Sequence, residues 1–399
     1  MWPADGRLRR AGDSAGGAPY ARCMTLIRAP RGVVAGAEVA DVWIETDGEV
    51  ITATGTGQPP RGPDVALTGL VLPGFVDQHC HGGGRGDFFA ADATAARTAA
   101  RIHLERGTTT LVGSLVTAAP DALLDQVRAL VPLVAEGVLA GIHLEGPWLS
   151  DRMCGAHDPA LLRDPDPAEI AAVVGAGGGS VVMATIAPEL DGALTAVRQL
   201  VDLGVVAAIG HTDCSYERAE EAIAAGATVA THLFNQMPPI HKRDAGAVVA
   251  LLADPRVVVE LIADGVHVDP RLIRFVVRSV GPDRVAGITD AMGAAGAPDG
   301  QYLIGRLDVT VSDGVARLTE GGALAGSTLT MDRAFRTLTD AGVGVADASR
   351  IVSSTPARAM GFADRGRLEP GFRADLVVLD DDRTVIGVMR AGRWEREPA

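Results

Sequence analysis

The sequence contains few cysteines, and their spacing excludes two common ways of stabilising a fold. Its 399 residues include Cys23, Cys80, Cys154 and Cys214, none of which forms a CxxC pair. Neither a disulfide framework nor a cysteine-bound zinc site is expected from such spacing. Free thiols are typical of a reducing compartment, so the sequence predicts a cytoplasmic protein.

Aromatic residues, lysine and long apolar runs are also scarce. Aromatic residues make up 4% of the chain, so the core must be aliphatic. The single lysine, Lys242, does not end a predicted strand, which argues against a metal centre bridged by a modified lysine. No apolar run reaches the ~18 residues needed to span a bilayer. The formal net charge of −14 argues against nucleic acid or an anionic membrane as a partner.

The first 23 residues are rich in glycine, alanine and arginine and show no hydrophobic periodicity. Their arginines are not followed by an apolar segment, so we do not expect a signal peptide here. We interpret residues 1–23 as a disordered extension and Met24 as a candidate start of the protein.

Between residues 71 and 358, apolar runs alternate with helical stretches, among them residues 216–225 and 270–280. The runs expected as strands cover residues 70–76, 109–115, 138–144, 181–186, 205–210, 227–231, 257–263 and 284–289. This α/β alternation predicts a (β/α)8 TIM barrel, interrupted by an inserted β-hairpin at about 301–320. A doubly wound open sheet is the alternative, but Gly82-Gly83-Gly84 matches neither nucleotide-binding fingerprint.

Short alternating strands flank the barrel segment at both chain ends. Residues 24–70 contain the turn signal Asp47-Gly48, and residues 359–399 contain a similar pair of strand patterns. We expect the two ends to pair into one small β-sandwich domain beside the barrel.

Several predicted strands end on residues that bind metals or transfer protons. These residues are His79, His81, Glu145, His211, His232 and Asp290. In a parallel barrel the carboxyl ends of all strands open onto one face, so these side chains can converge. His79 and His81 are two residues apart, which places both imidazoles on one face of a strand. The pattern predicts a metal-dependent hydrolase.

Glu145 follows an apolar strand, where an unpaired carboxylate would be costly to desolvate. With His211 and His232 it makes a known catalytic zinc set that leaves a position open for water. Asp290 is placed to take a proton from that water and pass it to a leaving group. The plain alternatives are a salt bridge for Glu145, hydrogen-bonded core histidines, and a helix N-cap for Asp290.

Three further residues are candidate substrate contacts. His157 lies in the loop after Glu145, and His267 follows another strand end. Arg243 lies in the loop after His232 and, with His267, would suit a phosphate group because Arg presents a fork of donors. A solvated surface charge is the alternative for Arg243.

Taken in order along the chain, these motifs resemble the N-acetylglucosamine-6-phosphate deacetylases of the amidohydrolase superfamily. The segments that carry the resemblance are LPGFVD (72–77), HLEGPW (143–148), GAH (155–157), APE (187–189), GHT (210–212), THLFN (231–235), DGVH (264–267), TDA (289–291) and LAGS (324–327). The resemblance extends over nearly everything from Met24 onward.

The resemblance implies a role for each matching residue. Glu145, His211 and His232 would bind the catalytic metal, His79 and His81 could hold a second ion, and Asp290 would transfer protons. The implied substrate contacts are Ala156, His157, Asn235, Gln236, Arg243, Asp264, His267, Leu324, Ala325 and Gly326.

The expected cofactor is one or two divalent metal ions, with zinc first and iron, manganese or cobalt as alternatives. The expected partner is a small phosphorylated amino sugar, and the resemblance implies a homodimer. Two other functions stay open: an amidohydrolase acting on a cyclic amide or an N-acyl amino acid, and a non-catalytic barrel that acts in assembly.

Overall fold

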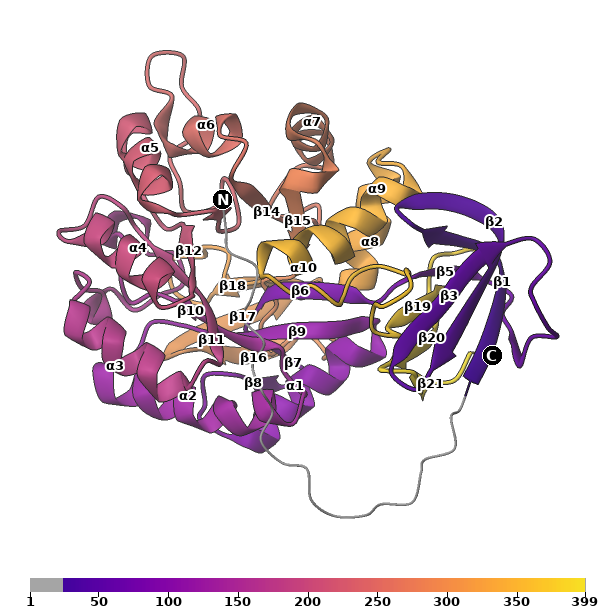
Figure 1. Ribbon diagram of the computed structural model, residues 1–399. Coiled ribbons are helices and arrows are strands. Elements are labelled where there is room, and N and C mark those ends of the chain that lie inside the picture. The colour runs from indigo at the N-terminus through magenta and orange to yellow at the C-terminus, as the bar shows by residue number, and fades with distance from the viewer. Residues whose placement is uncertain (1–23, 399) are drawn as a thin grey trace.

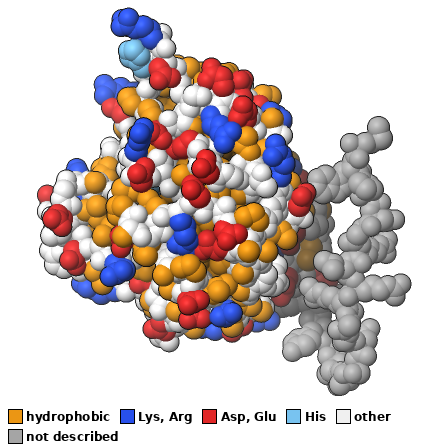
Figure 2. Space-filling model, turned by 90° about the vertical axis from the view of Figure 1, so that its left-hand side faces the viewer, with side chains coloured by type: hydrophobic (Ala, Val, Ile, Leu, Met, Phe, Trp, Pro, Cys, Tyr) orange, Lys and Arg blue, Asp and Glu red, His pale blue; other side chains and the backbone are white. Residues whose placement is uncertain are grey.

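The computed structural model describes residues 24–398 and is drawn in Figure 1. The predicted extension at residues 1–23 lies outside the described residues. Within them, no helix combines the length and apolar character that crossing a bilayer requires. The face in Figure 2 shows acidic and basic side chains interspersed with apolar ones.

A parallel barrel forms the larger part of residues 24–398 and confirms the predicted fold class. Its eight strands are β6 (Phe75–Cys80), β9 (Thr108–Leu115), β10 (Gly141–Glu145), β11 (Val181–Ile186), β12 (Val206–Ile209), β13 (Val229–Ala230), β14 (Val258–Ile262) and β15 (Val285–Ile288). Hydrogen bonds from the Asp290 amide to the His79 carbonyl (2.9 Å) and from the Thr289 hydroxyl to Asp77 (2.6 Å) join β15 to β6.

Helices surround the barrel (Figure 1). They include α1 (Ala93–Glu105), α2 (Pro120–Ala135), α3 (Pro167–Gly177), α4 (Ala193–Asp202), α5 (Tyr216–Ala225), α6 (Gly246–Ala253), α7 (Pro270–Val280) and α8 (Met331–Asp340). Asp92, Asp166, Ser215 and Asp269 accept backbone N–H groups as N-caps of α1, α3, α5 and α7. These caps explain why α5 and α7 begin at the predicted residues.

Strands from both chain ends form a second sheet beside the barrel (Figure 1). They are β1 (Met24–Val34), β2 (Ala37–Asp47), β3 (Val50–Thr56), β4 (Val65–Ala66), β5 (Leu70–Pro73), β19 (Leu376–Leu379), β20 (Val385–Arg390) and β21 (Arg393–Arg396). The sheet folds back on itself, because Ile51 pairs with Gly371 and Phe372 through two 2.8 Å backbone hydrogen bonds. It encloses its own apolar core, which includes Ile44 and Leu376.

The run at residues 70–76, expected as one strand, is divided at Gly74. β5 lies in the end sheet between β1 and β19, and the barrel begins only with β6 at Phe75. Gly74 packs against the barrel so closely that a Cβ atom there would lie 2.1 Å from the Thr109 hydroxyl oxygen. The end sheet therefore extends to Pro73, three residues beyond the predicted boundary.

The inserted segment contains one strand more than the predicted hairpin. β16 (Gly300–Ile304) pairs with β17 (Leu307–Ser312), which pairs with β18 (Val315–Leu318). Two short strands, β7 (Gly82–Gly83) and β8 (Gly86–Asp87), form a separate small hairpin. The insert matters for function because Ile304 reaches the cavity at the carboxyl ends of the barrel strands.

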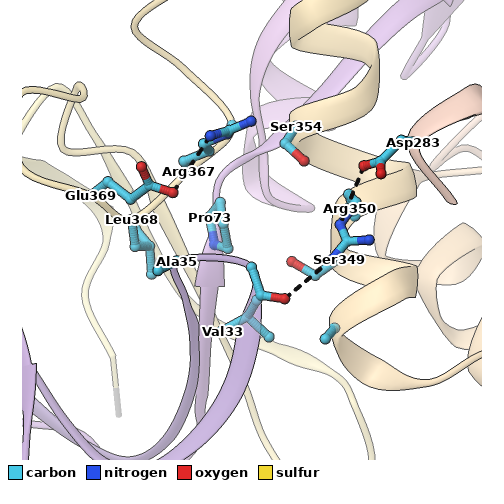
Figure 3. A pocket seen from close by; sticks show the side chains of 13 residues that line it. Val33, Ala35, Pro73, Asp283, Ser349, Arg350, Ser354, Arg367, Leu368 and Glu369 are labelled. Atoms are coloured by element: carbon cyan, nitrogen blue, oxygen red, sulfur yellow. Dashed lines mark hydrogen bonds and ion pairs between the residues drawn. The ribbon is translucent and has the colours of Figure 1, made fainter.

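A cleft of about 270 Å³ lies between the end sheet and the amino-terminal ends of the barrel strands (Figure 3). It is therefore at the other end of the barrel from the cavity that Ile304 reaches. Arg350, between α9 (Val345–Ser349) and α10 (Thr355–Ala359), bridges this junction. Its Nη2 donates to the Gly36 carbonyl at 3.3 Å, and its Nε lies 3.6 Å from Asp283.

Candidate metal centre

The strand-end residues converge on the carboxyl face of the barrel. His79 lies in β6, Glu145 is the last residue of β10, and His211, His232 and Asp290 follow β12, β13 and β15. The φ angles of the last three are 48°, 28° and 47°. Left-handed backbone is uncommon for residues other than glycine and clusters at functional sites. The surrounding fold therefore holds these three residues in a backbone conformation that their own local sterics disfavour.

Glu145 is the centre of the first group of possible ligands. Its Oε1 lies 3.2 Å from His211 Nε2 and 3.0 Å from His232 Nε2. The two Nε2 atoms are 3.0 Å apart, and all three side chains are buried. A carboxylate and two imidazoles within mutual reach are a donor set that suits zinc.

A second group shares Glu145. Its Oε2 lies 3.0 Å from His81 Nε2, and His81 Nε2 lies 3.1 Å from His79 Nε2. Asp290 Oδ1 is 3.3 Å from His81 Nε2 and 3.6 Å from His79 Nε2. The sequence prediction that these strand ends meet is therefore correct as a statement of geometry.

The tautomers of these histidines show that the groups fit a cation. Nδ1 of His211 lies 2.7 Å from the Met153 carbonyl, and Nδ1 of His81 lies 3.2 Å from the Ser114 carbonyl. A carbonyl oxygen can only accept, so each Nδ1 carries a proton, and each ring in its neutral form has its lone pair on Nε2. Lone pairs that face each other and the Glu145 carboxylate need a positive charge between them.

The electrostatics of the cluster independently favour positive charge beside Glu145 and Asp290. Burial disfavours a charged His81, but hydrogen bonds to Asp290 and Glu145 outweigh burial and raise the pKa of His81 to about 9. Burial, only partly offset by Glu145, lowers the pKa of His211 to about 4. Burial also opposes ionisation of Asp290, yet its hydrogen bond to His81 lowers its pKa to about 2. Asp290 is therefore an ionised carboxylate at neutral pH.

His157 has a different orientation from the possible ligands. Its Nδ1 accepts the Thr117 backbone N–H at 3.3 Å and lies 2.8 Å from the Thr117 hydroxyl. Since an amide N–H can only donate, Nδ1 is unprotonated and Nε2 of the neutral ring carries the hydrogen. That Nε2 lies 3.3 Å from Glu145 Oε2. His157 therefore presents a hydrogen-bond donor to the cavity and no lone pair.

Two further buried side chains, His143 and Glu260, contact His79 of the cluster. His143 lies between the Ser114 and Thr185 hydroxyls, at 2.9 and 2.8 Å, and packs edge-on against His79. Glu260, in β14, lies 3.1 Å from His79 Nδ1. We did not predict a role for Glu260, although a single carboxylate inside the apolar run 257–263 is the same signal that singled out Glu145.

A cavity of about 200 Å³ opens over these groups. The residues that line it are His81, Glu145, Gly155, Ala156, His157, His211, His232, Asn235, Gln236, His267, Asp290, Ile304, Leu324 and Gly326. Most of the expected substrate contacts are therefore in its wall, together with Gly155 and Ile304, which were not expected there. The cavity is large enough for a small polar ligand and is open to solvent.

Three expected substrate contacts lie outside this wall. Arg243 is exposed on the loop between β13 and α6. Ala325 is fully buried behind its neighbours. Asp264 lies behind His267, whose Nδ1 is 2.7 Å from its carboxylate. Asp264 can therefore orient His267 without meeting a ligand itself.

Comparison with known proteins agrees with the site. Residues 70–394 match the model of the amidohydrolase family. The chain is 32% identical over 367 residues to an N-acetylglucosamine-6-phosphate deacetylase of Lysinibacillus sphaericus, covering 89% of this chain and 93% of that protein. It is 36% identical over 321 residues to an N-acetylgalactosamine-6-phosphate deacetylase of Escherichia coli O157:H7, covering 78% and 84%.

Solved structures show the same likeness. A mutant N-acetyl-D-glucosamine-6-phosphate deacetylase of Mycobacterium smegmatis, in complex with N-acetyl-D-glucosamine 6-phosphate, superposes with a TM-score of 0.91. The two sequences are 48% identical, and the match covers 94% of this chain and 100% of that one. The chain belongs to the amidohydrolase family and, within it, to the N-acetylglucosamine-6-phosphate deacetylases.

Proposed function

We propose that this protein hydrolyses the acetamide of N-acetyl-D-glucosamine 6-phosphate, giving D-glucosamine 6-phosphate and acetate in amino-sugar catabolism. One observation carries the proposal. In a chain of this family, Glu145, His211, His232 and Asp290 meet at one open cavity. An amide is a poor electrophile with a poor leaving group, and this set offers both a cation site and a proton carrier.

We propose two adjacent cation positions. Glu145, His211 and His232 would hold one ion, and His79, His81, Glu145 and Asp290 would hold the other. Zinc is the expected ion because imidazole and carboxylate ligands suit it, with iron, manganese or cobalt as alternatives. When bound, such an ion lowers the pKa of a coordinated water toward ~7 and polarises a carbonyl oxygen.

Asp290 carries the proton in this proposal. Its carboxylate accepts a proton from the water that attacks the amide carbon, and then delivers it to the departing amine. Without that delivery the amine would leave as an anion. The Nε2–H of His157 is available to donate a hydrogen bond to the carbonyl oxygen as negative charge develops there.

We place the phosphate near His267, Asn235 and Gln236, at the side of the cavity formed by the loops after β13 and β14. Arg243 remains a proposed phosphate contact, and it would need movement of its exposed loop toward the cavity. Binding of the phosphate, remote from the reacting bond, would help to position the amide.

A cytoplasmic location and a homodimer are further parts of the proposal. Free cysteines at Cys80, Cys154 and Cys214 suit a reducing compartment. Light scattering of the purified full chain would test the homodimer.

An acetate-release assay tests the function directly. We expect turnover of N-acetylglucosamine 6-phosphate to exceed that of unphosphorylated N-acetylglucosamine, because the free sugar lacks the phosphate contact. N-acetylgalactosamine 6-phosphate belongs in the panel because a relative is named for it. A chain that released no acetate but opened a cyclic amide or cleaved an N-acyl amino acid would contradict the proposal. A metal-free chain that bound a protein partner would favour the non-catalytic alternative.

His267→Gln is expected to raise KM for the phosphorylated sugar by roughly 10-fold or more, with a smaller change in kcat. One hydrogen bond to a charged group is worth about 1.5–3 kcal/mol, which is the basis for this magnitude. The measurement is steady-state kinetics on phosphorylated and unphosphorylated sugars. Arg271→Ala is the matched control, because Arg271 is exposed on α7 nearby. An unchanged KM in His267→Gln would place the phosphate elsewhere.

A further inference from the structure

Glu260 is a fully buried carboxylate with one oxygen facing donors from two histidines of the metal centre. It projects from β14, the seventh strand of the barrel in sequence order. Oε2 lies 3.1 Å from His79 Nδ1 and accepts the backbone N–H of His232 at 3.1 Å. Oε1 accepts the Gln78 amide at 2.7 Å. Such a charge is costly to bury unless its surroundings stabilise it.

His79 differs from the other histidines of the cluster in what holds its Nδ1. His81 and His211 donate to backbone carbonyls, whereas His79 faces the Glu260 carboxylate. A carboxylate on the far nitrogen of an imidazole fixes the tautomer and makes the near nitrogen a stronger donor to a metal. The expected consequence is a stronger ligand at His79 Nε2.

We infer that Glu260 is the positioning residue that makes the second cation position, formed by His79, His81, Glu145 and Asp290, bind an ion tightly. The inference rests on the two-ion centre of the proposed function and assigns its second position a specific dependence on Glu260. The first position depends on Glu260 only through the His232 backbone N–H. The His232 imidazole makes no hydrogen bond to the carboxylate through Nδ1, which has no hydrogen-bond partner within residues 24–398.

Glu260→Gln isolates the effect of the charge. Within the described residues, Oε1 of Gln78 has no hydrogen-bond partner. Rotation of the Gln78 amide would present this oxygen to the new side-chain amide at position 260. The remaining oxygen could still accept from His79 and from the His232 N–H. The variant is therefore expected to fold, with the negative charge removed from behind His79.

The test is a zinc titration of chelator-stripped protein by calorimetry, with elemental analysis of the loaded chain. We expect wild type to bind two ions, and Glu260→Gln to bind the first normally and the second about 10–100-fold more weakly. Asp375→Asn, which changes a buried carboxylate in the end sheet, is the matched control and should keep both ions.

Three outcomes would overturn the inference: two ions bound by Glu260→Gln with wild-type affinity, equal weakening of both ions, or a single ion in wild type. The last would also remove the two-ion centre, while acetate release by the same preparation tests the deacetylase function separately. If Glu260→Gln does not fold, Gln78→Leu, which removes one donor to Glu260, should weaken the second ion selectively and to a smaller extent. Unchanged binding in Gln78→Leu would then refute the inference.

Discussion

Asp290→Asn is expected to lower kcat by about 10³-fold, in the middle of the range for a positioned general acid or base. Asparagine keeps the shape of the side chain and the backbone hydrogen bond to His79. It cannot accept a proton from the attacking water, and it cannot deliver one to the amine. The measurement is single-turnover acetate release, which separates chemistry from substrate binding.

Metal content decides how the Asp290→Asn result is interpreted, because Asp290 also belongs to the second cation group. We expect the ion held by Glu145, His211 and His232 to remain, since none of these ligands is changed. Asp213→Asn is a suitable control, because Asp213 is an acidic residue that binds Ser150 and Arg152 outside the cation groups. Retained metal together with wild-type turnover would refute the role of Asp290.

Glu145→Gln is expected to remove both ions and to lower activity by about 10³-fold or more. The reason is that no bound ion would then lower the pKa of the attacking water. Glu145 belongs to both cation groups, with one oxygen facing His211 and His232 and the other facing His81. Glutamine keeps the shape but removes the charge that both positions share. Its NH2 group would also occupy the place of one ligand oxygen.

The Glu145→Gln result is checked by zinc content after dialysis and by acetate release with added zinc. Chelation of the wild-type protein should reproduce the loss of activity, and added zinc should restore the wild type but not the variant at the same concentration. Glu169→Gln is a matched control, because Glu169 lies in α3 and pairs with Arg163. A variant that keeps two ions and normal turnover would exclude Glu145 as a shared ligand.

Local sequence patterns were sufficient to predict several helices, strands and strand-end residues of this protein. Helix α5 begins and ends at the predicted residues because Ser215 caps its first turn and Gly226 follows its last residue. The run 138–144 predicted a buried strand that ends at Glu145, and β10 ends there. Strand order follows sequence order around a parallel barrel, so residues at strand ends had to meet on one face.

Other features depend on contacts between distant parts of the chain. β5 belongs to the end sheet because β19, some three hundred residues later in the chain, pairs with it. No pattern within residues 70–76 encodes that partner. Arg243 looked equivalent to His267 from its position after a strand, but its loop turns outward into solvent.

The sequence by itself predicted the barrel, the strands at both chain ends and the polar groups that follow the barrel strands, because hydrophobic periodicity and the succession of strands are read along the chain. Only the tertiary structure decided which nitrogen of each histidine faces the cavity. That choice depends on partners such as Glu260 for His79 and Thr117 for His157, which lie 181 and 40 positions away in the chain. A hydrogen bond over such separations leaves no periodic signal in the sequence.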